Sequence, residues 1–222
     1  MASTTFEQAP EEAAPKVAGG PAELRHSPAE HLAEQFARYS STGPDGVSLR
    51  EIPFVTMIAV RVDPGGAAAS SMADVLGARL PVRGGLAAAG EKYSVLPQGP
   101  DEFIVVENCS ADADEAMDPV DPLDALTAAR DGGPGLVADV SANRTTFELS
   151  GPSARAVLEK SCAIDLHPRA FGDGAVASTM LGKTPVLLWR VGDAFHVMPR
   201  SSFADYLGRW LLDGMAEFAE AA

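Results

Sequence analysis

The sequence is poor in cysteine and in basic side chains, and it has no long hydrophobic run. Its 222 residues include two cysteines, Cys109 and Cys162, and isolated thiols indicate a reducing compartment rather than a disulfide framework. The longest apolar run, Phe54 to Val60, is far shorter than the roughly 20 residues that cross a bilayer. The N-terminal stretch lacks the basic region and apolar core of a secretory signal. We therefore expect a cytoplasmic protein without a membrane span.

The charge balance excludes two classes of partner. The chain has 17 Lys and Arg against 31 Asp and Glu, a net charge of −14. A surface this acidic is repelled by phosphate backbones and by anionic lipids. Hydrophobic residues make up 46% of the chain, which is ordinary for a globular protein. The composition favours a folded protein that binds neither nucleic acid nor membranes.

The N-terminal part of the chain divides into a tail and a helical segment. Residues 1–22 are rich in Ala, Pro, Glu and Gly, a composition that predicts a flexible tail. In residues 23–49, Ser27, Pro28 and Glu30 predict an N-cap, a proline at the first helical position and a capping box. We expect a short amphipathic helix there, followed by a linker.

The rest of the chain contains a pattern that occurs twice. Residues 50–135 and 136–222 each show a strand–helix–strand–strand–helix order. Two pairs of short segments match between these halves: Ser71–Leu76 with Ser153–Leu158, and Gly99–Val106 with Val191–Met198. Such a repeat predicts an internal duplication and an α+β fold with antiparallel sheets.

Helix signals occur at two further places. Asp121 followed by Pro122 predicts a capped helix start. A strongly periodic segment begins at Ser202, for which we expect Ser202 and Asp205 to act as caps. Its apolar stripe is predicted to consist of Phe203, Leu207, Trp210, Leu211 and Phe218.

Motifs for phosphate and metal binding are incomplete. The segment Gly182–Thr184 resembles the end of a P-loop, but Ala177 stands where that motif needs glycine, and Pro185 begins a strand. A turn between strands is the better interpretation. The four histidines show none of the usual metal-ligand spacings, so we predict no metal site. The adjacent acids Asp101 and Glu102 lie at a turn, where Asp favours the bend itself.

A nucleophilic site is represented by one weak pair. Cys162 and His167 are five residues apart, and a thiol hydrolase that uses them remains an alternative hypothesis. A small thiol directly after a helix is more often buried and inert. The sequence therefore predicts no catalytic residues.

Several motifs together carry a family resemblance. The chain contains R-T-x-x-x-L-x-G-P-x-A from Arg144 to Ala154, DLHPRAF from Asp165 to Phe171, and RSSFADYLGRWL from Arg200 to Leu211. The segment LPQGPDEFIVVE, Leu96 to Glu107, adds a fourth piece. With these motifs, residues 50–215 resemble the gamma subunit family of heterotetrameric sarcosine oxidase. The resemblance implies a shortened form of the folate-binding aminomethyltransferase fold of the glycine-cleavage system.

The resemblance also implies a setting. In that complex the alpha and beta subunits carry FAD, FMN and NAD, and the delta subunit carries zinc. The flavoprotein complex converts sarcosine to glycine and hydrogen peroxide and passes the one-carbon unit to tetrahydrofolate. The resemblance implies that the gamma chain is non-catalytic, carries no cofactor, and binds alpha, beta and delta subunits, chiefly alpha. The alternative is a stand-alone folate-binding one-carbon-transfer protein or regulator.

Two groups of residues are candidate sites within this resemblance. Pro168 cannot continue a helix, so the segment that contains it is expected to form a rigid exposed loop. Arginine and aromatic side chains on such a loop suit a protein interface. The interface candidates are Asp165, His167, Arg169, Phe171 and Arg200. The alternative is that Leu166 and Phe171 fill the local core while His167 bonds the backbone. Asn143 and Arg144 are the candidates for a folate contact.

Overall fold

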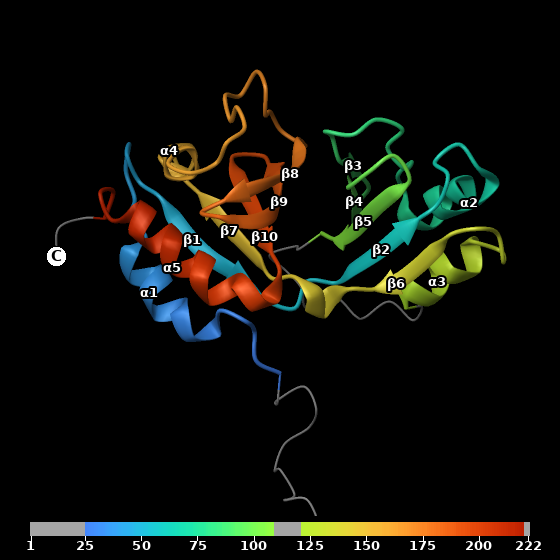
Figure 1. Ribbon diagram of the computed structural model, residues 1–222, viewed down its shortest axis with the longest axis horizontal. Helices are drawn as coiled ribbons and strands as arrows, with labels where there is room; N and C mark the ends of the chain where they lie inside the picture. Colours follow the sequence, from blue (N-terminus) through green and yellow to red (C-terminus); the bar gives the residue numbers. More distant parts are fainter. Residues whose placement is uncertain (1–24, 109–120, 220–222) are drawn as a thin grey trace, which may run out of the picture.

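The protein contains two β-sheets that lie side by side along the long axis of the molecule (Figure 1). The computed structural model describes residues 25–108 and 121–219, so the predicted tail, residues 1–22, lies outside the described residues. Each sheet has five strands, and every pairing between strands is antiparallel. The α+β prediction is confirmed. None of the described helices has the length and apolar character needed to span a membrane.

The first sheet, called sheet A here, has the strand order β1-β7-β10-β9-β8. Its strands are β1 (Ser48–Ile52), β7 (Thr146–Ser150), β8 (Val176–Leu181), β9 (Thr184–Val191) and β10 (Ala194–Pro199). One face packs against α1 (Ala33–Tyr39), α4 (Ala154–Glu159) and α5 (Ala204–Met215). Phe147, Leu149 and Phe195 point to these helices because side chains of a strand alternate between its two faces. This face and its helices form the largest buried core.

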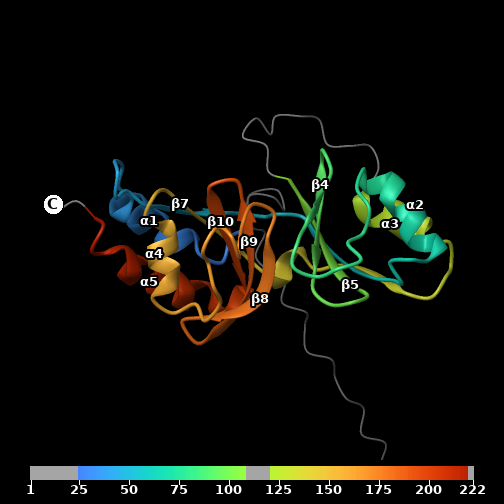
Figure 2. The ribbon, with the colours of Figure 1, turned by 90° about the horizontal axis from the view of Figure 1, so that it is seen from above.

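The second sheet, sheet B, has the order β3-β4-β5-β2-β6. Its strands are β2 (Met57–Arg61), β3 (Ala88–Ala89), β4 (Tyr93–Pro97), β5 (Glu102–Glu107) and β6 (Leu136–Asp139). Its outer face packs against α2 (Ala67–Leu76) and α3 (Pro122–Ala129), with Met72, Phe103 and Leu126 at the centre. The view from above shows the same two groups of elements (Figure 2).

A third apolar cluster joins the two sheets. Met57, Leu96 and Val106 come from sheet B, and Leu187, Trp189 and Met198 come from sheet A. These side chains lie on the strand faces opposite to those that meet the helices. Each sheet is therefore buried on both faces over part of its area.

Each half of the chain contributes one edge strand to the sheet of the other half. Strand β1 precedes β2 in the chain but pairs with β7, with Ile52 opposite Thr146. Strand β6 precedes β7 but pairs with β2, with Ala59 opposite Ala138. The predicted division at residues 135 and 136 therefore does not coincide with the sheets: β6 belongs to sheet B, and β1 belongs to sheet A. With this exchange, β1-β7-β10-β9-β8 matches β6-β2-β5-β4-β3 strand for strand.

Local predictions are confirmed at turns and at one helix cap. The Asp121 carboxylate accepts a hydrogen bond from the Leu123 amide at 2.8 Å, with Pro122 at the first position of α3. Gly182 and Lys183 have φ angles of 54° and 70° and connect β8 to β9. Two residues in left-handed conformations form the tight hairpin turn that replaces the rejected P-loop.

Two predicted caps are wrong. The Ser27 hydroxyl donates to Glu51 Oε2 at 2.5 Å instead of capping the helix. Helix α5 has no side-chain cap, and the 3-10 turn η4 (Ser201–Phe203) leads into it. Phe203, placed by sequence in the apolar stripe, is 41% exposed. In both cases a contact with a distant segment or the turn geometry overrides the local pattern.

Candidate functional site

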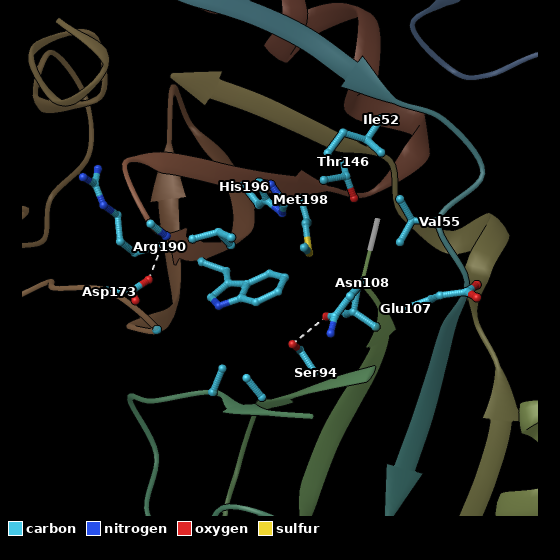
Figure 3. A pocket seen from close by; sticks show the side chains of 17 residues that line it. Ile52, Val55, Ser94, Glu107, Asn108, Thr146, Asp173, Arg190, His196 and Met198 are labelled. Carbon is cyan, nitrogen blue, oxygen red and sulfur yellow. Dashed lines mark hydrogen bonds between the residues drawn. The ribbon is translucent and has the colours of Figure 1, made fainter. Parts of the chain in front are cut away.

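A cavity of about 370 Å³ lies between the two sheets (Figure 3). Sheet A contributes Ile52, Thr146, Trp189, His196 and Met198, and sheet B with its flanking loop contributes Ala89, Ser94, Val106, Glu107 and Asn108. The volume is near the lower end of the range for small-molecule sites, about 300–1000 Å³. The lining is mainly apolar with a few polar groups, which is typical of such sites.

Two polar atoms of the cavity lining are buried without a hydrogen-bond partner among the described residues. They are the indole Nε1 of Trp189 and the hydroxyl of Thr146, whose residues are 8% and 1% exposed. Leaving a buried donor unpaired costs about 1–3 kcal/mol. By contrast, the Ser94 hydroxyl donates to Asn108 Oδ1 at 2.7 Å, and the Gly192 amide donates to Asp173. The cavity therefore offers one fixed N–H donor and one hydroxyl to a guest molecule.

A row of side chains crosses sheet A beside the cavity. Arg50 is opposite Glu148, Glu148 is opposite His196, and His196 is opposite Trp189. Arg50 Nε lies 2.7 Å from Glu148 Oε1, and His196 Nε2 lies 3.3 Å from Glu148 Oε2. The rings of His196 and Trp189 meet edge to face with centroids 5.3 Å apart. Cross-strand neighbours on one face thus form a continuous polar row that ends at the indole.

Burial determines the charge state of this row. Burial lowers the pKa of His196, and the hydrogen bond to Glu148 only partly offsets this effect. Burial raises the pKa of Glu148. The hydrogen bonds and charges of Arg50 and His196 lower this pKa by a larger amount, so the net shift is downward. At neutral pH the row contains an ionised glutamate paired with arginine and a neutral imidazole. The sequence showed only that His196, like the other histidines, lacks the spacing of a metal ligand, and it did not predict this arrangement.

A second polar cluster lies where β6 passes into β7 (Figure 1). Arg144 and Arg200 form an isolated antiparallel bridge, although they are 56 residues apart in the chain. Arg144 Nη1 donates to the Met198 carbonyl at 2.9 Å, and Arg200 Nη1 donates to Asn143 Oδ1. The structure therefore brings together Asn143 and Arg144, predicted for a folate contact, with Arg200, predicted for a protein interface.

The loop Asp165–Phe171 combines both alternatives that the sequence left open. Phe171 is 7% exposed and stacks on Phe195 with centroids 6.4 Å apart, so its prediction as an exposed anchor is wrong. Leu166 is also buried. The Arg169 amide donates to His167 Nδ1 at 3.2 Å, while the side chains of Asp165, His167 and Arg169 stay exposed. Core contacts fix the loop, and its polar side chains face outward.

The remaining chemical candidates are not assembled into a site. Among residues 25–108 and 121–219, no group of three or more His, Cys, Asp or Glu could hold a metal ion. Cys162 is a free, partly buried thiol packed against the core of sheet A. His167 uses its Nδ1 for the loop backbone, which does not orient it toward a nucleophile.

Comparison with known proteins decides the family. The sequence profile of the sarcosine oxidase, gamma subunit family matches residues 60–217. The chain belongs to this family. It is 47% identical to the sarcosine oxidase subunit gamma of Arthrobacter sp, over 88% of this chain and 92% of the relative. It is 44% identical to the subunit gamma of Corynebacterium sp. strain P-1, with the same coverage.

Solved structures agree with the family assignment. A chain in the heterotetrameric sarcosine oxidase of Corynebacterium sp. U-96, determined with pyrrole 2-carboxylate, matches with a TM-score of 0.80 and 39% identity. The match covers 90% of this chain and 98% of that one. The aminomethyltransferase T of Bartonella henselae matches with a TM-score of 0.57 and 17% identity, over 85% of this chain and 57% of that one. This second match shows a shared fold.

Proposed function

We propose that this chain is the accessory gamma subunit of a heterotetrameric sarcosine oxidase and that the chemistry takes place on its partner subunits. The observation that carries this proposal is the likeness to a chain of such an assembly at 39% identity, over 98% of that chain. The proposed complex oxidises sarcosine to glycine and hydrogen peroxide and transfers the one-carbon unit to tetrahydrofolate.

The chemistry of the described residues supports a non-catalytic role. The polar row beside the cavity has no net charge, because Arg50 is paired with Glu148 and burial keeps His196 neutral. The free thiol of Cys162 is partly buried and packs against the core of sheet A. On this proposal the alpha, beta and delta subunits carry FAD, FMN, NAD and zinc, and tetrahydrofolate binds among them.

The proposed assembly places the gamma chain chiefly against the alpha subunit. The exposed side chains of Asp165, His167 and Arg169 extend from a loop whose position is fixed by Leu166 and Phe171 in the core. A preorganised loop loses little conformational entropy on binding. The free Cys162 thiol supports a reducing, cytoplasmic location.

Co-expression tests this function directly. The tagged chain is expressed with and without the genes for the large subunits, and the eluate is assayed for flavin absorbance and for sarcosine-dependent hydrogen peroxide. A yellow, active complex that is recovered with the tagged chain is the expected result. Recovery of the tagged chain alone, from cells that contain the active oxidase, would refute the proposal.

The cavity favours a second candidate function, a folate-binding module. The unpartnered Trp189 Nε1 and Thr146 hydroxyl suit the polar edge of a flat ring. The chain has two tryptophans, so Trp210→Phe leaves Trp189 as the single fluorescent reporter in the cavity. Saturable quenching of this variant by 5-formyltetrahydrofolate, absent in Trp189→Phe, would support the folate-binding function. No saturable quenching is expected if the chain acts only as an accessory subunit.

A further inference from the structure

The paired arginines at the junction of the two sheets have no acidic partner among residues 25–108 and 121–219. Neither Arg144 nor Arg200 makes an ion pair with any of the described residues. The backbone bridge between Arg144 and Arg200 nevertheless holds the two residues side by side. In a chain with a net charge of −14, two adjacent cations that pair with no carboxylate in the described part of the chain are unexpected.

The acids nearest to Arg144 in the chain are committed to other groups. The Asp139 carboxylate accepts from the Ser141 hydroxyl at 2.6 Å and from the Ser141 amide. Glu148 is bound to Arg50 and His196. Neither acid therefore serves as the counter-charge of Arg144.

The acids nearest to Arg200 are committed in the same way. Asp205 binds His31 at 2.6 Å and Arg209 at 2.9 Å. Asp193 lies 3.4 Å from Arg190. The sequence thus supplies acids on both sides of each arginine, but the fold directs all of them elsewhere.

The two arginines repel each other, and this repulsion affects the pKa of Arg144. Burial lowers the pKa of Arg144, and the nearby charge of Arg200 lowers it further. Arg144 is partly buried and held by the Met198 carbonyl, whereas Arg200 is exposed and held by Asn143 Oδ1. Each guanidinium therefore has one donor fixed by the protein and other donors available for a further acceptor.

An exposed aromatic side chain borders the pair. The Phe203 amide donates to the Arg200 carbonyl at 2.8 Å, and the Phe203 side chain is 41% exposed. Arginine and exposed aromatic residues are the types most enriched at the centres of protein interfaces. This composition favours a protein surface over a free small anion as the occupant.

We propose that Arg144 and Arg200 form the receptor for a carboxylate side chain of a partner subunit, with Phe203 as the adjoining apolar contact. This inference rests on the proposed role as a subunit. A guanidinium binds a carboxylate through two parallel N–H bonds, so two neighbouring guanidinium groups suit one carboxylate or two adjacent ones. The same carboxylate relieves the repulsion between the two arginines.

Charge reversal at Arg200 is the sharpest test, because Arg200 is exposed and its loss leaves the Arg144 bond to Met198 intact. We expect Arg200→Glu to reduce the partner protein retained per tagged chain by tenfold or more at 150 mM salt. Arg155→Glu on α4 is the matched control: it has the same change in charge at an exposed residue paired with Glu159. The control should retain the partners as the wild type does.

One further variant separates charge from geometry, and one stability measurement separates both from folding. Arg200→Lys keeps the charge but loses the planar fork, so we expect an intermediate loss. The thermal midpoint of isolated Arg200→Glu should stay close to that of the wild type, because exposed Arg200 loses one hydrogen bond to Asn143 while its repulsion with Arg144 is removed. A large loss of stability in the isolated chain would contradict the inference.

The outcomes distinguish this inference from the proposed function. If the wild-type chain fails to recover partner subunits, the subunit proposal fails. If the wild type recovers them and Arg200→Glu does so equally well at 50 and 500 mM salt, only the carboxylate receptor is refuted. Binding of citrate to the isolated chain that depends on Arg200, with complex retention unchanged, would also refute it in favour of a free anion.

Discussion

The two sheets repeat one topology but differ in what they carry. Sheet A packs three helices on its outer face, and sheet B packs two. The polar row, the arginine pair and the Asp165–Phe171 loop all belong to the sheet A half. Sheet B contributes both apolar and polar side chains to the shared cavity, and apolar side chains to the cluster between the sheets. On the proposed function, the same framework serves as a support in one half and as the partner-binding surface in the other.

The exchange of β1 and β6 makes the two halves one cooperative unit. Each sheet contains one strand that belongs to the other half of the chain. Unfolding one sheet therefore removes an edge strand from its neighbour and exposes the cluster between them. We expect a single unfolding transition in spite of the internal repeat.

The largest expected effect comes from truncating the two cores in parallel. Phe147 in sheet A and Phe103 in sheet B are each at most 1% exposed, and each change to Ala should lower the unfolding free energy by about 3–5 kcal/mol. Both tryptophans lie in the sheet A half, in β9 and α5. If the halves are coupled, Phe103→Ala shifts the urea midpoint measured by tryptophan fluorescence as well as that measured by circular dichroism. An unshifted fluorescence transition would show independent halves.

A smaller effect on stability is expected at two neighbouring threonines, Thr145 directly before β7 and Thr146 at its first position. The buried Thr145 hydroxyl donates to Glu51 at 2.5 Å, and Glu51 also accepts from the Ala29 amide. Thr145→Val should cost about 1–3 kcal/mol, because it leaves a carboxylate oxygen without this donor. Thr146→Val removes a buried hydroxyl that has no hydrogen-bond partner among the described residues, so it should leave the unfolding free energy unchanged or raise it by up to about 1–3 kcal/mol. Equal losses in the two variants, measured by urea denaturation, would contradict the assigned contacts.

The smallest expected effect is a dependence of stability on pH. The pKa of His196 is lowered below its usual 6.5 by burial, so the unfolded chain takes up a proton at a higher pH than the folded one. Its contribution is fully present above pH 6.5 and is lost as the pH falls through the lowered folded pKa. Glu148, whose pKa is lowered below 4.5, adds a loss in the same direction at lower pH. His196→Gln should flatten the decline in thermal midpoint just below pH 6.5, and an unchanged slope would contradict the buried neutral state.

Sequence patterns were sufficient for the repeat and for much of the local structure, two helix caps excepted. Strand alternation, the Asp121 cap and the Gly182–Lys183 turn depend on residues that are close in the chain, so the pattern contains the relevant forces. The matched segments, Ser71–Leu76 and Ser153–Leu158, do lie in α2 and around α4, which follow corresponding strands.

Contacts between segments that are distant in the chain could not be predicted from local sequence patterns. The partner of β1 is almost 100 residues away, and a strand pattern does not specify which sheet the strand joins. Arg144 and Arg200 meet only through an isolated bridge, so the sequence assigned them to two different roles. Phe171 lies in a polar loop, and only the position of Phe195 determines that its ring is buried.

The most direct measurement is hydrogen exchange of the gamma chain, alone and within the purified oxidase complex. We predict protection on assembly in residues 141–146, 165–171 and 198–206, which contain the arginine pair, the fixed loop and the exposed Phe203. The outer helices α2 and α3 of sheet B should exchange at the same rate in both states. Protection confined to α2 and α3, with the three segments of the sheet A half unchanged, would contradict the assignment of that half as the partner-binding surface.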